Sequence, residues 1–464
     1  MALRIFNTLT RKKEEFVPLT PGQVGIYVCG VTVYDLSHVG HARSALAFDM
    51  IRRYLQFRGY TVRFVRNFTD VDDKIIQRAA REGVSAKVVS ERYVAAERED
   101  MAALGVLAPD VYSKATDHIP QMVALIEKLV AKGLAYAVEG DVYFEVMRFP
   151  GYGKLSGKNL EELLSGARVE VDERKRDPRD FALWKGAKPG EPSWPSPWGP
   201  GRPGWHIECS AMAIEYLGET FDLHGGGEDL IFPHHECEIA QAEACTGKTF
   251  ARYWVHNGMV NMGKEKMSKS LGNTLNIREI VKRHTPDTLR LWMLGTHYRN
   301  LIEWSEERVE ESKRAFERLS RLVHDAAAVR DGGPAAPLPQ AFAEFRPRFE
   351  RAMDDDFNTS QALGVLFDFG RALADTRDRG AESRGAFVAG VDELVRLGRV
   401  LGLFAGEAAT DGPPHQVQEL LTARRDARAR RDFKRSDEIR DEIAQLGWLV
   451  EDTPAGPRLT PKGR

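Results

Sequence analysis

Metal-binding side chains gather in residues 205–238, which hold two of the four cysteines and four of the twelve histidines of the chain. If a helix begins at Pro233, whose fixed φ suits a first helical position, His234 and Glu238 share one face four residues apart. Together with the Cys209 thiolate, they offer three ligand types that zinc accepts. The alternative is a helix N-terminus whose polar residues face water. Residue types alone leave the ligand set open, since three neighbours have the same chemistry: His224, His235 and Cys237.

Two histidines and a lysine-containing loop have the chemistry to bind phosphate. His38 and His41 stand where a helix is expected to begin, so free backbone N–H groups and the helix dipole favour an anion there. Lys266 and Lys269 lie in a basic loop between glycines, residues 263–273, which suits several phosphate oxygens. Each segment also has a plainer interpretation, a helix cap for the histidines and an ordinary surface loop for the lysines. The sequence contains neither a P-loop nor a dinucleotide fingerprint.

The elements that must position these groups begin with a βαβ unit. Residues 25–29 are β-branched and aromatic and predict a buried strand, and residues 60–65 predict the next one. Between them the pattern predicts a helix that ends at Gly59 and whose apolar stripe consists of Leu46, Met50, Tyr54 and Leu55. This order predicts an α/β fold with a parallel sheet, which binds ligands at the carboxyl ends of its strands.

The bulk composition is that of an ordinary globular protein. Its 464 residues point to about three domains, and 42% hydrophobic residues provide an ample core. The net charge of -2 gives no general attraction to nucleic acid, so such binding requires local patches. Four cysteines without a C-x-x-C pattern fit a reducing cytoplasm with free thiols. We expect no membrane span, because no run of about 18 uncharged apolar residues occurs.

Two of these segments are similar to the signatures of class I aminoacyl-tRNA synthetases: His38-Val39-Gly40-His41 and Lys266-Met267-Ser268-Lys269-Ser270. Other segments resemble cysteinyl-tRNA synthetases in particular, and the likeness covers essentially the whole chain. These segments are residues 204–210, 225–236, 353–359 and 447–454. The departures are small: Val39 replaces isoleucine, Ser37 stands where cysteine is frequent, and Cys237 stands where asparagine is expected.

The resemblance implies a Rossmann-type parallel-sheet catalytic domain over residues 1–295, with an insertion at about 110–205. A helical bundle that docks tRNA is expected over 296–405, and a small C-terminal anticodon-binding module over 406–464. The resemblance also selects one zinc ligand set from those that the chemistry left open and adds a distant cysteine to it: Cys29, Cys209, His234 and Glu238. At one residue from Glu238, the thiol of Cys237 is expected to point to a different face.

The resemblance further implies a reaction. Cysteine and ATP would give cysteinyl-adenylate and pyrophosphate, and the cysteinyl group would pass to the 3′-terminal ribose of tRNA(Cys). His38 and His41 would stabilise charge on the α-phosphate, and Lys266 and Lys269 would hold the β- and γ-phosphates. Mg²⁺ is expected on the ATP. Further ATP contacts are expected at Gly225, Gly226, Gly227 and Asp229, and substrate contacts at Gly30, Thr69, Trp205 and Asp229.

Selection of cysteine against serine would depend on the metal. An ordinary pocket separates such near-isosteres by about 10²-fold. Zinc with borderline-soft ligands would bind the substrate thiolate directly, whereas the alkoxide of serine is too basic to form. We therefore expect no editing domain. We further expect a monomeric, cytoplasmic enzyme whose partners are tRNA(Cys), ATP and L-cysteine.

Two other functions are compatible with parts of the pattern. A ligase that joins cysteine to an amino sugar would share the catalytic core, but a small acceptor needs no helical and C-terminal tRNA platform. A non-catalytic, zinc-dependent RNA-binding protein would not need the two phosphate-binding signatures. Pyrophosphate exchange and the choice of acceptor separate these functions from the expected one.

Overall fold

The computed structural model of the protein describes residues 2–158, 173–262, 265–266, 275–330, 336–380, 383–405, 415–430, 432–446, 448–453 and 456–461. The chain forms two compact units, Met1–Leu403 and Phe404–Arg464. Within the described residues, no helix has the length and apolar character needed to cross a membrane.

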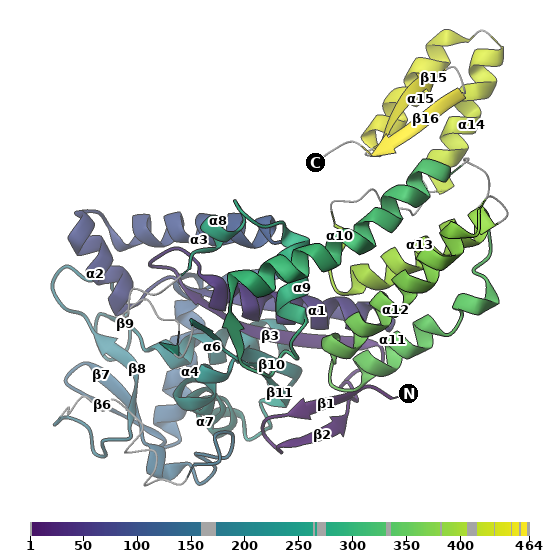
Figure 1. Ribbon diagram of the computed structural model, residues 1–464. Coiled ribbons are helices and arrows are strands. Elements are labelled where there is room, and N and C mark those ends of the chain that lie inside the picture. Colours follow the sequence, from purple (N-terminus) through teal and green to yellow (C-terminus); the bar gives the residue numbers. More distant parts are fainter. Residues whose placement is uncertain are drawn as a thin grey trace. The chain divides into compact units, whose positions relative to one another are not determined.

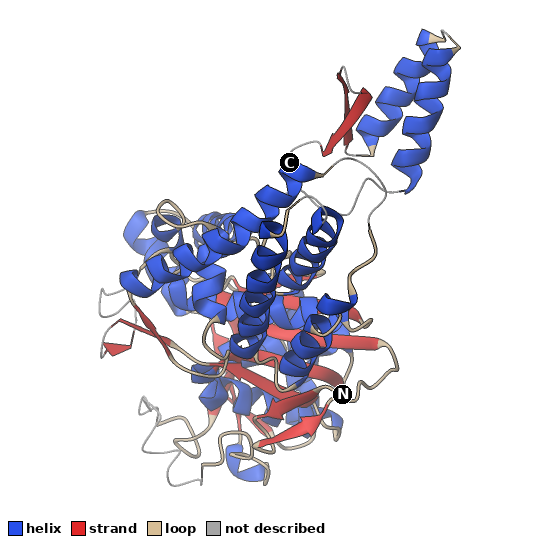
Figure 2. Cartoon of the chain, turned by 45° about the vertical axis from the view of Figure 1, so that its right-hand side comes forward, coloured by secondary structure: helices blue, strands red, loops and turns tan. Residues whose placement is uncertain are grey.

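A five-stranded parallel sheet forms the centre of the first unit, with helices on both of its faces (Figure 1 and Figure 2). The strand order is β11-β10-β3-β4-β5, and every neighbouring pair is parallel. Because β4 lies on one side of β3 and β10 on the other, the connections diverge between β3 and β10. Open α/β sheets bind ligands at such a point, outside the carboxyl ends of the strands. The bounds are β3 Gln23–Thr32, β4 Thr61–Thr69, β5 Val111–Lys114, β10 Phe221–Gly227 and β11 Ala251–Asn257.

Helix α1, Val39–Phe57, confirms the predicted connection between the first two strands of this sheet. The residues of the predicted stripe are all fully buried, and Gly59 after the helix adopts φ +87, which glycine adopts without strain. Strand β4 is longer than the predicted strand, because it continues to Thr69. On the opposite face of β3, Tyr27 and Cys29 join a core with helices α4, Ile119–Ala131, and α6, Trp205–Leu217.

The chain between β5 and β10 carries a separate antiparallel sheet of order β6-β7-β8-β9. Its fully buried Trp184 lies 6.3 Å from Trp198 between ring centroids, and the partly buried Trp194 packs on the same core. The insertion therefore has its own aromatic packing, which joins the core of the first unit. The strands are β6 Ala135–Val138, β7 Asp141–Phe144, β8 Phe181–Gly186 and β9 Gly201–Pro203.

Helices dominate the first unit after residue 285, which includes the region 296–405 where the resemblance implied a helical bundle. Ser305 accepts a hydrogen bond from the backbone N–H of Arg308 and so caps α10. These helices are α9 Pro286–Leu294, α10 Glu306–Val329, α11 Phe345–Asp354, α12 Thr359–Asp378 and α13 Arg384–Val400. The remaining elements of this unit are α2 Asp73–Glu82, α3 Ala86–Ala103, α7 Glu236–Thr246, α8 Ile277–Ile280, β1 Arg4–Asn7, β2 Lys12–Glu15, β12 Val260–Met262, β13 Glu265–Lys266 and β14 Ile302–Trp304.

In the second unit, the described residues form two helices and a β-hairpin. Its small core contains Val417, Ile439 and Ile443, with Trp448 packed against them. The elements are α14 His415–Ala429, α15 Phe433–Gln445, β15 Trp448–Thr453 and β16 Gly456–Pro461. The predicted fold class, a Rossmann-type parallel sheet with an insertion, a helical region and a small C-terminal module, is therefore confirmed.

Candidate active site

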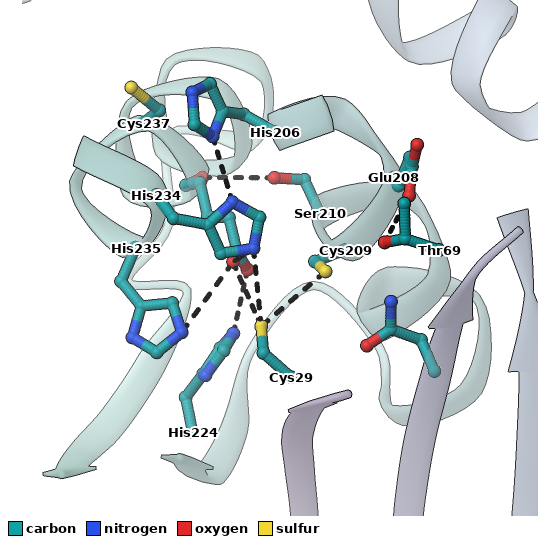
Figure 3. Close-up of polar contacts among 12 residues, drawn as sticks. Cys29, Thr69, His206, Glu208, Cys209, Ser210, His224, His234, His235 and Cys237 are labelled. Carbon is teal, nitrogen blue, oxygen red and sulfur yellow. Dashed lines mark hydrogen bonds and ion pairs between the residues drawn. The ribbon is translucent and has the colours of Figure 1, made fainter. Parts of the chain in front are cut away.

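Four metal-binding side chains from separate elements meet at the carboxyl end of β3 (Figure 3). Cys29 lies on β3, Cys209 on α6, and His234 and Glu238 lie around the start of α7. The Cys29 sulfur is 3.5 Å from the Cys209 sulfur, 3.5 Å from His234 Nε2 and 3.3 Å from Glu238 Oε1. All four side chains are buried, and their donor atoms lie within 4.8 Å of one another. Tetrahedral zinc ligands stand roughly 3.3 to 3.8 Å apart, so this group is able to bind a metal.

The helix boundary that we predicted beside this group was wrong. Helix α7 begins at Glu236 rather than at Pro233. A separate turn over Ile231–His235 precedes it and is interrupted at Phe232, whose φ of −139 and ψ of 132 are extended. Since the backbone returns to helical angles after Phe232, the expected contact still forms, and His234 Nε2 lies 3.0 Å from Glu238 Oε1.

Burial and the neighbouring side chains together determine which of the metal-binding side chains are charged. Burial disfavours charge on Glu238, but the facing imidazoles of His224 and His234 hold the pKa of its carboxyl well below the usual value. Burial opposes charge on Cys209 as well, yet contacts with Cys29 and His234 lower the pKa of its thiol to about 6. At neutral pH the group therefore already contains a carboxylate and a thiolate, the anionic forms that bind a metal.

A second group of buried donors lies behind the first and contains His224 and His235 in addition to Cys29 and Glu238. His224 Nε2 lies 2.8 Å from Glu238 Oε2, so it holds one carboxylate oxygen while the other faces His234. The first group lies beside an accessible side chain, because His234 stacks at 4.2 Å on the ring of Trp205, which is 39% exposed. The first group therefore suits a metal that a substrate must reach, and His224 suits an orienting role.

Two histidines of this neighbourhood were not among the residues predicted from the sequence. His206 Nδ1 lies 2.9 Å from His234 Nδ1, and this contact directs the other nitrogen of His234 toward the cysteines. His256 Nε2 lies 2.8 Å from His235 Nδ1, and its own Nδ1 contacts the hydroxyl of Thr8 at 2.8 Å. His206 stands in the histidine-rich segment that the sequence displayed, whereas His256 comes from β11 and carried no local signal.

Cys237 points away from the metal donors, as expected from its place beside Glu238. Figure 3 shows its sulfur on the far side of the His234 ring from the Cys29 sulfur. The Cys237 sulfur lies 3.2 Å from the hydroxyl of Tyr152, and burial raises the pKa of this thiol. Its contacts are therefore with the insertion and not with the donors.

Two of the residues expected to bind substrate border the metal-binding group. Trp205 is the first residue of α6 and covers His234 by ring stacking. Thr69, the last residue of β4, donates its hydroxyl to Glu208 at 2.8 Å. Burial, together with the charge of the neighbouring Cys209, raises the pKa of Glu208 well above its usual value.

The glycines expected to contact ATP or substrate have packing roles that the sequence did not reveal. A Cβ atom at Gly225 would lie 2.2 Å from the ring of Phe48 on α1, and one at Gly226 would lie 2.9 Å from the side chains of His235 and Leu230. Gly30 approaches the backbone of a neighbouring strand, since a Cβ there would lie 1.7 Å from the Asn67 carbonyl oxygen. Gly227 lies at the end of β10 and is half-buried, and Asp229 follows it in an exposed turn.

His38 and His41 form the N-terminal cap of α1 with their Nδ1 atoms. His38 Nδ1 accepts from the N–H of Gly40 at 3.1 Å, and His41 Nδ1 accepts from the N–H of His38 at 3.3 Å. The two rings stack with centroids 3.8 Å apart. Because Nδ1 accepts in both neutral rings, the proton resides on Nε2 in each, which makes each a hydrogen-bond donor. The two histidines therefore cap the helix, and they also present the N–H donors that phosphate binding needs.

The flanks of the two predicted phosphate-binding signatures meet in space. Val39 N–H donates to the Leu275 carbonyl at 3.0 Å, and Ile277 N–H donates to the Ser37 carbonyl at 3.0 Å. Residues 275–277 follow the lysine-containing loop directly. The backbone of Lys266 belongs to β13, whereas its side chain and all of Lys269 lie outside the described residues.

The parallel-sheet fold and the residues gathered at the carboxyl ends of its strands are those of a class I aminoacyl-tRNA synthetase, and comparison with known proteins agrees. Residues 15–314 match the class I (C) tRNA synthetase catalytic domain family, residues 348–405 match the DALR domain, and residues 410–456 match the cysteinyl-tRNA ligase anticodon binding domain. The chain belongs to the cysteine–tRNA ligase family, and it is an aminoacyl-tRNA ligase.

Individual relatives match this chain over nearly their whole length. The cysteine–tRNA ligase of Pelobacter propionicus is 52% identical over 98% of this chain and 99% of its own length. That of Geobacter sulfurreducens is 52% identical with the same coverage. Solved structures show the shared fold at lower identity. Mycobacterium tuberculosis methionyl-tRNA synthetase bound by methionyl-adenylate is 16% identical over 82% of this chain and 90% of that chain, with a TM-score of 0.61. An Agrobacterium radiobacter LeuRS complex is 12% identical over 83% and 85%, with a TM-score of 0.62.

Proposed function

We propose that the protein joins cysteine to tRNA(Cys) in two steps at the crevice between β3 and β10. Cysteine and ATP would first form cysteinyl-adenylate and pyrophosphate, and the cysteinyl group would then pass to the 3′-terminal ribose of the tRNA. The observation that carries the proposal is that a buried Cys/His/Glu group and a histidine-capped helix N-terminus both lie at the carboxyl end of β3, the central strand of the sheet. The first can recognise a thiol, and the second can bind a phosphate.

His38 and His41 are the proposed catalytic residues of the adenylation step, together with Lys266 and Lys269. The Nε2–H groups of both histidines would donate to the α-phosphate as the cysteine carboxylate attacks in line, which offsets the charge that develops on the equatorial oxygens. Lys266 and Lys269 would hold the β- and γ-phosphates, with Mg²⁺ on the ATP. These roles are electrostatic and positional and involve no covalent intermediate with the protein.

The nucleotide is proposed to lie along the end of β10. The backbone of Gly225, Gly226 and Gly227 would let adenine or ribose approach closely, and Asp229 would bind the ribose or the substrate ammonium group. Gly227 and Asp229 are the most accessible of these four residues, which supports a contact at this end of the strand. Gly30 and Thr69, at the ends of the two neighbouring strands, would line the amino-acid side of the crevice.

Cys29, Cys209, His234 and Glu238 are the proposed ligands of one Zn²⁺ per chain. Two thiols, an imidazole and a carboxylate are a donor set that fits zinc. When bound, zinc would supply a Lewis-acidic centre with affinity for the thiolate sulfur of cysteine. Trp205, stacked on His234, would close the pocket around the side chain. The hydroxyl of serine stays protonated near neutral pH, and this difference would make an editing domain unnecessary.

The domain roles remain part of the proposal. Residues 1–295 would carry catalysis with an insertion at about 110–205, residues 296–405 would dock tRNA, and residues 406–464 would read the anticodon. The family matches of residues 348–405 and 410–456 support this division. We propose a monomer that acts in the cytoplasm.

Pyrophosphate exchange into ATP tests the proposed function directly. The assay compares cysteine, serine and no amino acid at equal concentration. Exchange that depends on cysteine and is weaker by more than about 10²-fold with serine is expected. Equal exchange with serine would refute the selective role of the metal, and exchange without any amino acid would refute adenylate formation. Aminoacylation of tRNA(Cys) in the same preparation then tests the second step.

A further inference from the structure

Residues 353–359, which the proposed reaction does not use, connect α11 to α12 through a left-handed backbone. Asp356 has a φ of +62 and is fully buried. Its Oδ1 accepts hydrogen bonds from the Phe6 N–H at 2.8 Å and from the Tyr298 hydroxyl at 2.8 Å. Its Oδ2 pairs with Arg299 Nε at 2.7 Å. A buried carboxylate with these partners ties the turn after α9 to the helical region.

The other side of that turn holds a buried cation of α1. Arg43 lies two residues beyond His41 and is 1% exposed. Its guanidinium donates to the carbonyls of His297 at 2.8 Å, Thr296 at 3.2 Å and Asn300 at 3.5 Å, and also to the Met293 carbonyl. These carbonyls stand at or after the C-terminal end of α9, where the helix dipole favours a positive charge. Among the described residues, no carboxylate pairs with this guanidinium.

The turn after α9, residues 296–300, therefore contacts Arg43 on one side and Asp356 on the other. Within it, His297 supplies a carbonyl to Arg43 while its Nε2 lies 2.9 Å from the Asp356 carbonyl oxygen. The same connecting segment also holds the far end of α1, because the Tyr54 hydroxyl donates to Asp354 at 2.6 Å. Both ends of α1 are therefore held by hydrogen bonds: Arg43 bonds the turn after α9, and Tyr54 bonds Asp354 of the helical region.

We propose that Asp356, Arg299 and Arg43 are positioning residues that set the first turn of α1, and thereby the nucleotide, from the helical region. This inference rests on the proposed function of His38 and His41. The physical reason is that α1 moves as a rigid element, so a shift at Arg43 is passed to the histidines one turn away. A displacement of about 1 Å at a reacting group is enough to change a rate by about 10²-fold.

The test uses the full-length enzyme and the variants D356N, R43K and the double variant, with D355N as the matched control. D356N keeps an acceptor for Phe6 and Tyr298 but removes the charge that pairs with Arg299. Asp355 belongs to the same connection, but its half-exposed carboxylate bonds Lys13 instead. We expect D356N and R43K each to raise the KM for ATP in pyrophosphate exchange by roughly 3- to 30-fold, with unchanged metal content and KM for cysteine. D355N should match the unmodified enzyme.

Coupling is measured by the double variant and by a readout that does not depend on activity. A shared route predicts that the double variant loses no more than the larger single effect, and multiplication of the two effects would overturn the inference. Amide hydrogen exchange at residues 38–44 should accelerate in D356N and not in D355N. If D356N fails to fold, R299K replaces it, since Arg299 is partly exposed. Unchanged KM and unchanged hydrogen exchange in the variants would overturn the coupling alone, whereas absence of exchange activity in the unmodified enzyme would overturn the proposed function.

Discussion

Cys209 is the donor whose thiol is most easily ionised, because contacts with Cys29 and His234 lower its pKa to about 6. Replacement by serine removes the thiolate and leaves a hydroxyl that does not ionise near neutral pH. We predict that Cys209→Ser loses metal affinity by more than the roughly 10- to 100-fold that orienting partners contribute, and that cysteine-dependent pyrophosphate exchange falls with it. Bound metal per chain and exchange rate are measured on the same preparation.

Cys237→Ser is the matched control for this substitution. Its sulfur is also buried and lies one residue from Glu238, but it faces Tyr152. It should therefore retain the metal and the exchange rate. Equal loss of metal from both variants would show that a general packing defect, and not ligation, explains the result.

Metal affinity should increase with pH. Burial, followed by the neighbouring Cys209 and Glu238, raises the pKa of the Cys29 thiol well above its usual value, so Cys29 is protonated near neutral pH in the metal-free protein. Binding must displace that proton, and a lower pH therefore opposes binding. Chelator competition between about pH 6 and pH 8 should show affinity rising at least about tenfold per pH unit. A flat profile would mean that Cys29 does not act as a thiolate ligand.

At the scale of elements, most of the prediction came from hydrophobic periodicity and from residues that begin or end helices. The apolar stripe of α1 and its end at Gly59 are local properties of the sequence, and this helix formed where expected. The start of α7 was misplaced because Ile231–His235, with the extended residue Phe232, forms a separate turn before the helix begins at Glu236. Gly225 was likewise unexplained by sequence, since its neighbour Phe48 comes from another element.

Gly225→Ala should destabilise the protein through the contact of β10 with α1. A methyl group there meets the Phe48 ring at 2.2 Å, so the helix or the ring must shift, at a cost of about 1–3 kcal/mol. Gly364→Ala is the control, because Gly364 lies within α12 with open space around its Cβ position. That change should stabilise by up to about 1 kcal/mol. Thermal unfolding of both variants is compared, and equal midpoints would contradict the packing argument.

At the scale of the whole molecule, Phe404–Arg464 is a compact unit with a core of its own. The metal-binding group and the cap of α1 lie in the other unit. Deletion of residues after about 405 should therefore preserve pyrophosphate exchange within about twofold and reduce aminoacylation of tRNA(Cys) by at least about tenfold, the effect of losing roughly 1.4 kcal/mol of binding. Both activities are measured on one truncated preparation. A parallel loss of both would argue against a separate anticodon-reading module.

At this scale, the candidate site shows which ligands the sequence alone could not predict. Residue chemistry between 205 and 238 indicated a metal but left the ligands undecided, and Cys29 entered only through the family resemblance. The structure brings Cys29 to Cys209 because β3 and α6 pack against each other, a contact between positions 180 residues apart. Spacing within one segment has no information about such a partner.

This separation along the chain has a consequence during synthesis. Cys29 leaves the ribosome long before His234 and Glu238 exist, so an emerging chain cannot assemble the full donor set until more than half of it has been translated. Before that moment its first cysteine is an ordinary exposed thiol, open to cellular oxidants and to adventitious soft metals. The interval between those two events is therefore a period of vulnerability that the finished enzyme, with all four cysteines buried, no longer has.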